Sequence, residues 1–436
     1  MTQLTHQGVW WLPSAPSVHV GGMLVFDDDK GLTLNLLGAL DGTPLGGPWP
    51  SYPILQGCTD GGEAITLINC SLIGRHQAYP GFLTQKYRPT RALIGCHFDA
   101  PDELQFYQVR FRCSHLEEWF GSWPFYIRPE VDEADGRQRH EFGYERIPPL
   151  RCGLQDVNFS AGQDFNWQEE ALELHIDYRT SASFGRDTAL TIDQWQEWYL
   201  QPFRNFLALA SGAHTRVLRT EFHVEPSPRA GAIPRVNTVE LITPSLCYLG
   251  EKPELLGSDR MLFILDDVRD QFPVVLTHWL KMSRELGHVI NLYLGARNNR
   301  ALYMEQQFLS TIQALEGYHR HWFTPESRRG AKRQLKDRLA DLIDYTGTIM
   351  IPWIASDSGD DNFAGRSANF RNNLSHLLTP GHGALDSEAL SWMMAGLSWL
   401  FEACLLRSLG LTHEHVTALV QRNQRYQNTV RHAPNS

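Results

Sequence analysis

The sequence predicts an α+β chain of several domains, in which a β-rich antiparallel sheet domain precedes an all-helical bundle. Its 436 residues exceed one typical domain, and 42% of them are apolar, enough to bury a core. Short apolar segments punctuated by Gly, Pro and Asp fill about the first 180 residues, and long helical patterns begin near residue 260. We therefore divide the chain into a β-rich domain (1–260), connecting helices (261–300) and a helical domain (301–436).

No helix-length segment separates the first candidate strands, which favours antiparallel pairing in a sandwich or barrel-like sheet. Candidate strands occupy residues 23–26, 32–37, 64–68, 92–98, 109–113 and 171–179. In the fifth of these, Val109, Phe111 and Cys113 alternate with two arginines. In 171–179 apolar residues likewise occupy every second position from Leu172 to Tyr178. This period predicts one buried and one solvent-facing side of each strand.

A helix is expected at about 191–211. Thr191 and Gln194 have the spacing of a capping box, Gly212 ends the pattern, and Pro202 predicts a kink. Two strands follow. They are expected at about 217–225 and 236–242. Six later helices are predicted at 268–286, 288–296, 303–323, 328–346, 365–379 and 385–410.

Cysteine use and hydropathy predict a cytoplasmic protein without a membrane segment. The seven Cys are scattered without a C-x-x-C pair, as expected for reduced thiols. The first residues show no basic region followed by an apolar stretch, so no secretory signal is predicted. The longest strongly apolar run, 392–401, is about half the length of a membrane span.

The net charge of −10 argues against a nucleic-acid partner until it is divided along the chain. Residues 301–436 hold 13 basic and 13 acidic residues, so the whole deficit lies in 1–300. Six basic residues crowd into 328–338 beside one acid. Five of them are candidate RNA-binding residues: Arg328, Arg329, Lys332, Arg333 and Lys336. The alternative is an ordinary solvated helix face.

Several common sites lack their motifs. The chain has no G-x-x-x-x-G-K, G-x-G-x-x-G, G-x-S-x-G or H-E-x-x-H sequence. The pairs His319/His321 and His413/His415 are two residues apart, which on a helix points them to different faces. We therefore predict neither a metal nor a cofactor.

Residues 370–383 carry the clearest chemical signal, with Arg371, Asn372 and His376 on one predicted helix that ends near Pro380. Asn372 and His376 are four residues apart and share a face, whereas Arg371 and His376 are about 140° apart on an ideal helix. Two such helices meeting across a two-fold axis would bring two Arg and two His together. The alternative is that these residues make capping, ion-pair and interhelical contacts only.

The Arg-Asn-x-x-x-His arrangement in a late helical domain resembles the HEPN superfamily. The whole chain resembles ApeA-type anti-phage defence proteins, which join an ApeA-like N-terminal domain to a C-terminal HEPN domain. The matching segments are 109–121, 191–198, 308–323 with Glu316, and 370–378.

This resemblance implies a metal-independent endoribonuclease that cleaves RNA in abortive infection and is regulated by its N-terminal domain. Its site would form at a HEPN interface in a homodimer or higher homo-oligomer, with tRNA one candidate substrate and a phage-derived trigger that the sequence does not identify. His376 would act as general base or acid, Arg371 would stabilise transition-state charge, and Asn372 would orient the histidine or bind phosphate. Glu316 is an accessory candidate, with a structural role as its alternative.

Two other readings of the sequence stay open. A non-catalytic RNA-binding or dimerisation adaptor would keep the HEPN fold without the chemistry, although it would not need Arg371, Asn372 and His376. The other hypothesis is a small-molecule-binding β domain attached to a structural helical bundle. In that case the Arg-Asn-x-x-x-His arrangement would occur by chance and have no function. Alanine substitution of Arg371 and His376 separates the catalytic reading from both.

Overall fold

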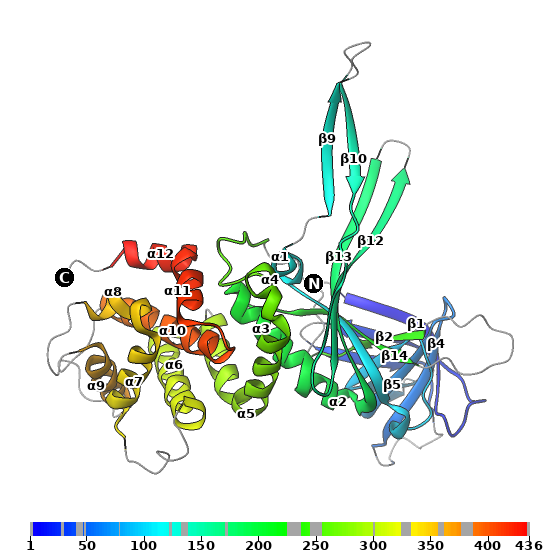
Figure 1. Cartoon of the computed structure of the whole chain (residues 1–436). Coiled ribbons are helices and arrows are strands. Elements are labelled where there is room, and N and C mark those ends of the chain that lie inside the picture. Colours follow the sequence, from blue (N-terminus) through cyan, green and yellow to red (C-terminus); the bar gives the residue numbers. More distant parts are fainter. Residues whose placement is uncertain are drawn as a thin grey trace. The chain divides into compact units, whose positions relative to one another are not determined.

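The chain forms two compact units, of which the first is mainly strand and the second mainly helix (Figure 1). The computed structural model describes residues 3–27, 30–40, 47, 49–77, 79–121, 124–131, 138–170, 173–224, 237–244, 255–299, 301–323, 333–355, 362–375 and 387–433. Unit 1 comprises Met1–Glu117, Ser122–Leu200 and Arg216–Glu254. Unit 2 comprises Glu118–Gly121, Gln201–Thr215 and Leu255–Ser436. The predicted fold class is confirmed, and the predicted three-part division stays a prediction.

Six strands of unit 1 close into an antiparallel barrel. They are β1 (Gln3–Trp11), β2 (Val20–Asp27), β3 (Gly31–Leu36), β4 (Ser51–Thr59), β5 (Ala64–Gln77) and β6 (Leu83–Arg88). The order is β5-β4-β1-β2-β3-β6, and β6 pairs with β5 as well as with β3. This second pairing closes the barrel and leaves no free edge among the six strands.

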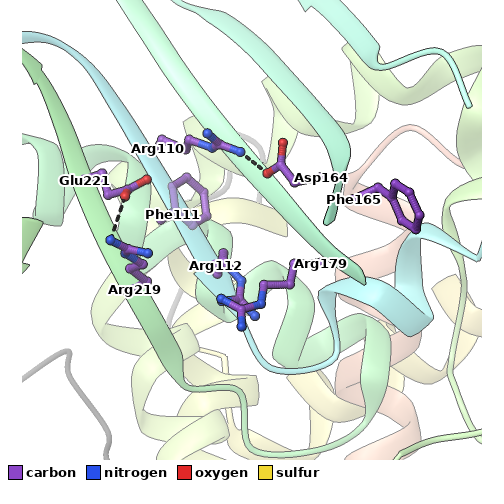
Figure 2. A pocket seen from close by; sticks show the side chains of 8 residues that line it. All are labelled: Arg110, Phe111, Arg112, Asp164, Phe165, Arg179, Arg219 and Glu221. Atoms are coloured by element: carbon purple, nitrogen blue, oxygen red, sulfur yellow. Dashed lines mark hydrogen bonds and ion pairs between the residues drawn. The ribbon is translucent and has the colours of Figure 1, made fainter. Parts of the chain in front are cut away.

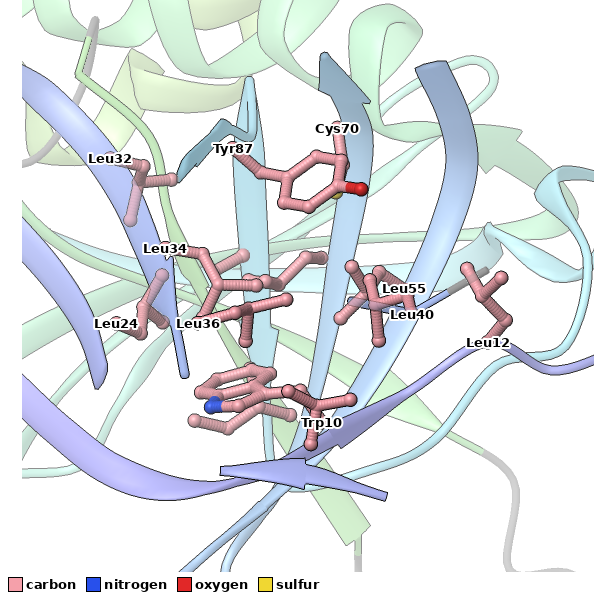
Figure 3. Close-up of a cluster of buried hydrophobic side chains, with 14 of the residues drawn as sticks. Trp10, Leu12, Leu24, Leu32, Leu34, Leu36, Leu40, Leu55, Cys70 and Tyr87 are labelled. Atoms are coloured by element: carbon pink, nitrogen blue, oxygen red, sulfur yellow. The ribbon is translucent and has the colours of Figure 1, made fainter. Parts of the chain in front are cut away.

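Large apolar side chains fill the barrel, with Trp10 packed among leucines (Figure 3). Trp10, Leu34, Leu55 and Leu67 are fully buried. A Cβ atom at Gly57 would lie 2.2 Å from the Trp10 ring, so glycine is required where β4 passes the indole. The buried side chains of these strands thus form the inner layer of a closed sheet.

The remaining strands of the main sheet extend it beyond β5, in the order β7-β15-β14-β8-β13-β12-β11. Their bounds are β7 (Arg91–Ile94), β8 (Gln105–Cys113), β11 (Leu150–Gly153), β12 (Asn158–Glu170), β13 (Glu173–Thr191), β14 (Val217–Val224) and β15 (Asn237–Ile242). A separate hairpin joins β9 (Phe125–Val131) to β10 (Gln138–Tyr144). On β8, Val109, Phe111 and Cys113 are buried as the alternation predicts. Most of the alternation predicted for 171–179 lies outside the described residues and side chains.

The capping box predicted at Thr191 is present, with the Thr191 side chain and Gln194 bonded reciprocally. The helix that follows consists of α2 (Ile192–Trp195), a π-helical turn (Gln196–Leu200) and α3 (Gln201–Ser211). The irregularity expected from Pro202 thus takes the form of a π turn just before it. Proline has no N–H to donate, so the regular helical ladder is interrupted at this point.

Unit 2 is built mainly from helices. Short segments are α1 (Leu116–Phe120), α4 (Leu265–Val268) and α8 (Ile351–Ile354), and longer ones are α5 (Phe272–Asn298), α6 (Met304–Tyr318), α7 (Leu335–Thr346), α9 (Phe363–Ser375), α10 (Ser387–Ser408), α11 (His413–Arg422) and α12 (Gln424–Arg431). The boundary predicted near residue 287 is a local break inside α5 at Leu286. In the described part of the chain, α10 alone is long and apolar enough to cross a membrane, but 67% of its most apolar window is buried, as in a core helix.

Candidate active site

Helix α9 carries Arg371 and is held against α6 by aromatic packing. Phe370 of α9 meets Phe308 of α6 edge to face, with ring centroids 4.9 Å apart. The start of α9 is fixed by Asn362, whose Oδ1 accepts a hydrogen bond from the Gly365 amide at 2.8 Å. These contacts set the register in which α9 and α6 present their polar side chains to each other.

Glu316 of α6 is the carboxylate that Arg371 reaches. Arg371 Nη2 lies 3.4 Å from Glu316 Oε2, and Arg320 Nη2 lies 2.5 Å from Glu316 Oε1. Arg338 of α7 adds a third guanidinium, with its Nε 4.0 Å from Glu316 Oε1. Three helical segments therefore place three cations around one carboxylate. We call Glu316, Arg320, Arg338 and Arg371 the arginine cluster.

The cluster is partly shielded from water. The Glu316 and Arg338 side chains are 17% and 11% exposed, whereas Arg371 is 32% exposed. Burial, followed by repulsion from Arg320, lowers the pKa of Arg338. One carboxylate facing three guanidiniums leaves an excess of positive charge, which favours an anion at the exposed side of Arg371.

His319 contacts Arg338 of the arginine cluster and lies on a π-helical turn (His319–Phe323) that continues α6. It is 1% exposed. Its Nε2 lies 2.8 Å from Asp341 Oδ2, and its Nδ1 lies 3.2 Å from Arg338 Nη1. Because an arginine can only donate, Nδ1 accepts and Nε2 carries the proton. Burial, together with Arg338 and Arg333, lowers the pKa of His319 to about 4, so the ring is neutral at pH 7.

The other predicted site residues are distributed as follows. Asn372 is exposed and accepts a hydrogen bond from Arg371 Nη1 at 3.1 Å. Arg333 forms an ion pair with Asp341, and Lys336 is exposed on α7. Four predicted residues lie outside the described residues: His376, Arg328, Arg329 and Lys332. The roles assigned to all of these residues remain predictions.

Four members of this site were not selected from the sequence: His319, Arg320, Arg338 and Asp341. Arg320 follows Glu316 by four residues, a spacing that predicts an ion pair on a helix and was a usable signal. The contacts of Arg338 and His319 depend on the packing of α7 against α6 and have no local signal. In the described part of the chain, no group of three or more His, Cys, Asp or Glu side chains is arranged to hold a metal ion.

Unit 1 contains a charged hollow of about 290 Å³ (Figure 2). Four arginines and two acids line it: Arg110, Arg112, Arg179, Arg219, Asp164 and Glu221. Arg110 pairs with Asp164, and Arg219 lies 3.1 Å from Glu221 and 2.8 Å from Glu240. The pairs Arg110–Asp164 and Arg219–Glu240 join different strands of the sheet, whereas Arg219 and Glu221 both lie on β14.

Comparison with known proteins gives two family matches. A model described as ApeA N-terminal domain 1 matches residues 5–279, and one described as Apea-like HEPN matches residues 309–415. The second range contains the whole arginine cluster, together with His319 and Asp341. Comparisons with curated proteins and with solved structures return no match.

Proposed function

The chain belongs to the ApeA family, and on that premise we propose that it is a metal-independent endoribonuclease that cleaves RNA during anti-phage defence. Cleavage would end in abortive infection, and the N-terminal part would regulate it. The observation that carries this proposal is Arg371, a partly exposed guanidinium held by Glu316 inside the range that matches HEPN.

RNA supplies its own nucleophile, the 2′-hydroxyl, so cleavage requires proton transfer and charge stabilisation rather than a bound metal. In the proposed mechanism His376 removes or returns the proton. Arg371 binds the charged oxygens of the phosphorus-centred transition state, for which a planar guanidinium is suited. Asn372 orients His376 or binds phosphate.

Glu316 acts in this proposal as a positioning residue. Its carboxylate holds Arg371 from one side, at 3.4 Å, and leaves about a third of that side chain exposed. An arginine restrained by a carboxylate loses less rotamer freedom when phosphate binds. The surplus positive charge of the arginine cluster then attracts the scissile phosphate.

The proposal includes the partners implied by this chemistry. RNA, with tRNA one candidate, would follow the basic segment 328–336 toward the site, and Arg333 and Lys336 are its described members. A homodimer or higher homo-oligomer would form through the HEPN domain in the cytoplasm. A phage-derived trigger would act through the acidic N-terminal part.

The test uses the full chain and the variants Arg371→Ala and His376→Ala. Arg431→Ala is the matched control, because Arg431 is an exposed arginine at the end of α12. We expect both site variants to abolish RNA cleavage in the presence of EDTA and to relieve toxicity in cells, whereas the control retains both. A single 2′-deoxy substitution at the cleaved position should block cutting.

Sequencing of cleaved RNA ends from cells, with and without phage, identifies substrate and trigger in one experiment. Cleavage that persists in both site variants, or that requires a divalent metal, contradicts the proposal.

The second candidate is a non-catalytic RNA-binding or dimerisation adaptor. The contact that favours it is the same ion pair, since Arg371 and Glu316 also join α9 to α6 and have a structural use. An adaptor would bind RNA in all three variants and cleave it in none. Binding and cleavage measured on the same preparations therefore separate the two functions.

A further inference from the structure

A polar cavity of about 690 Å³ lies within unit 2. It is formed by the end of α3, by residues 256–262, by the end of α5 and by the first turns of α12. Its polar lining is made of arginines, amides, hydroxyls and one histidine: Arg260, Arg297, Arg425, Asn298, Asn423, Gln424, Asn428, Ser211, Thr429 and His214. None of the described residues that line it carries a carboxylate.

Two of the arginines are held in place from behind by Glu402 of α10, whose side chain is fully buried. Glu402 Oε1 accepts hydrogen bonds from Arg297 Nη1 at 2.8 Å and from the Tyr293 hydroxyl at 2.6 Å, and Oε2 accepts one from Arg425. Burial alone would raise the pKa of Glu402, but Arg425 and Arg297 outweigh it and hold the pKa below its usual range.

Packing restrains the same two arginines further. The Arg425 guanidinium lies 4.1 Å from the centroid of the Trp399 ring. Arg297 Nη2 donates a hydrogen bond to the Ala208 carbonyl at 2.9 Å. One buried carboxylate therefore fixes two cations beside the cavity and neutralises only one of them.

Three helix ends lie around the cavity, those of α3, α5 and α12. Helix α12 begins at Gln424, which lines the cavity, and the amides of its first residues are bonded to Asp259 O and Asn423 Oδ1. The C-terminal carbonyls of α3 would oppose an anion, but Ala208 O accepts from Arg297 and Ala210 O accepts from the Leu262 amide at 2.7 Å. Two of the last four carbonyls of α3 are thus bonded internally.

The charged hollow of unit 1 provides a contrast. There Asp164 and Glu221 line the hollow and pair with Arg110 and Arg219 (Figure 2). An incoming anion would have to compete with these carboxylates. In the cavity of unit 2 the carboxylate of Glu402 is not among the described lining residues, which include three arginines.

We propose that the cavity of unit 2 binds a small phosphorylated molecule. Guanidinium forks match phosphate oxygens, and the amides and hydroxyls can hydrogen-bond the rest of a polar ligand. The volume lies within the range of about 300–1,000 Å³ typical of small-molecule sites. The lining arginines disfavour a cation. Leu256 and Leu262 are the only large apolar side chains among the described lining residues, so the cavity does not suit an apolar ligand.

This site goes beyond the proposed nuclease function and is tested without it. Binding of ATP, AMP and inorganic phosphate to the full chain is measured by isothermal titration calorimetry. The comparison of the three separates a nucleotide from free phosphate as the source of the phosphate group.

Two substitutions on α12 add the same charge at neighbouring positions. Asn428→Asp puts a carboxylate into the lining, and Gln427→Glu puts one on an exposed position of the same helix outside the lining. Both side chains are exposed, so neither change buries a charge.

We expect at least one of the three probes to bind, and Asn428→Asp to weaken that binding about tenfold through repulsion over a few ångströms. Gln427→Glu should leave it within about twofold. The proposal is overturned if all three probes bind more weakly than about 10 mM. It is also overturned if the two variants reduce binding equally.

Discussion

Replacing Glu316 by glutamine removes the one carboxylate that three guanidiniums share, while keeping the shape of the side chain. Arg320, Arg338 and Arg371 would then face each other across a neutral amide. We expect two consequences. The variant should be less stable, because mutual repulsion replaces attraction, and Arg371 should lose the contact that orients it.

The expected loss of stability follows from the solvent exposure of the three arginine side chains. The pair with Arg320, whose side chain is 53% exposed, contributes at most about 0.5 kcal/mol after solvent screening. Arg371 and Arg338 are 32% and 11% exposed, and each contributes about 0.5–1 kcal/mol. The free energy of unfolding should therefore fall by about 2 kcal/mol, which lowers Tm by about 4–8 °C for a unit of this size.

Urea and thermal denaturation measure the stability, with Glu305→Gln as the control. Glu305 lies in the first turn of the same helix, α6, and is exposed. In an RNA cleavage assay, Glu316→Gln should lower kcat/KM about tenfold, and a double-mutant cycle with Arg371→Gln should give a coupling of about 0.5–1 kcal/mol. A variant that matches Glu305→Gln in both stability and cleavage refutes the reasoning.

Three further outcomes are expected. Glu402→Gln should lower the free energy of unfolding in urea by about 3–5 kcal/mol, because two guanidiniums lose a buried partner, whereas Glu388→Gln at the exposed start of the same helix should change it by at most about 0.5 kcal/mol. The pKa of His319 is about 4 in the folded chain and about 6.5 when unfolded, so the unfolded chain binds the extra proton in this window. Stability should therefore fall by up to about 3 kcal/mol as pH drops from 6.5 to 4, and His319→Gln should flatten this part of the pH curve. If the basic segment follows RNA, Lys336→Gln should reduce the slope of log K against log salt by about 0.7–0.9, and Arg333→Gln by less, since Arg333 pairs with Asp341.

The features of the unit 1 sheet that depend on local sequence patterns could be predicted. Alternation at 109–113 identified the buried face of β8, because a strand repeats every two residues. Barrel closure was one of two alternatives, since it depends on β6 pairing with both β3 and β5. Strand pairing depends on the fit of side chains that are distant in the chain, as at Gly57 of β4 against Trp10 of β1, and no local pattern encodes that fit.

At the candidate site, too, the local contacts were predictable from the sequence and the long-range contacts were not. The pair of Glu316 with Arg320 is local and follows from helical spacing. Arg371 is 55 residues from Glu316 in the chain. The two meet because Phe370, the residue before Arg371, packs on Phe308 of the helix that carries Glu316. Placement of Arg371 thus depends on the apolar residue beside it. Phe308→Ala, which leaves a cavity, should therefore disturb Arg371 without removing any charge, and Arg371→Gln should leave Phe370 packed on Phe308.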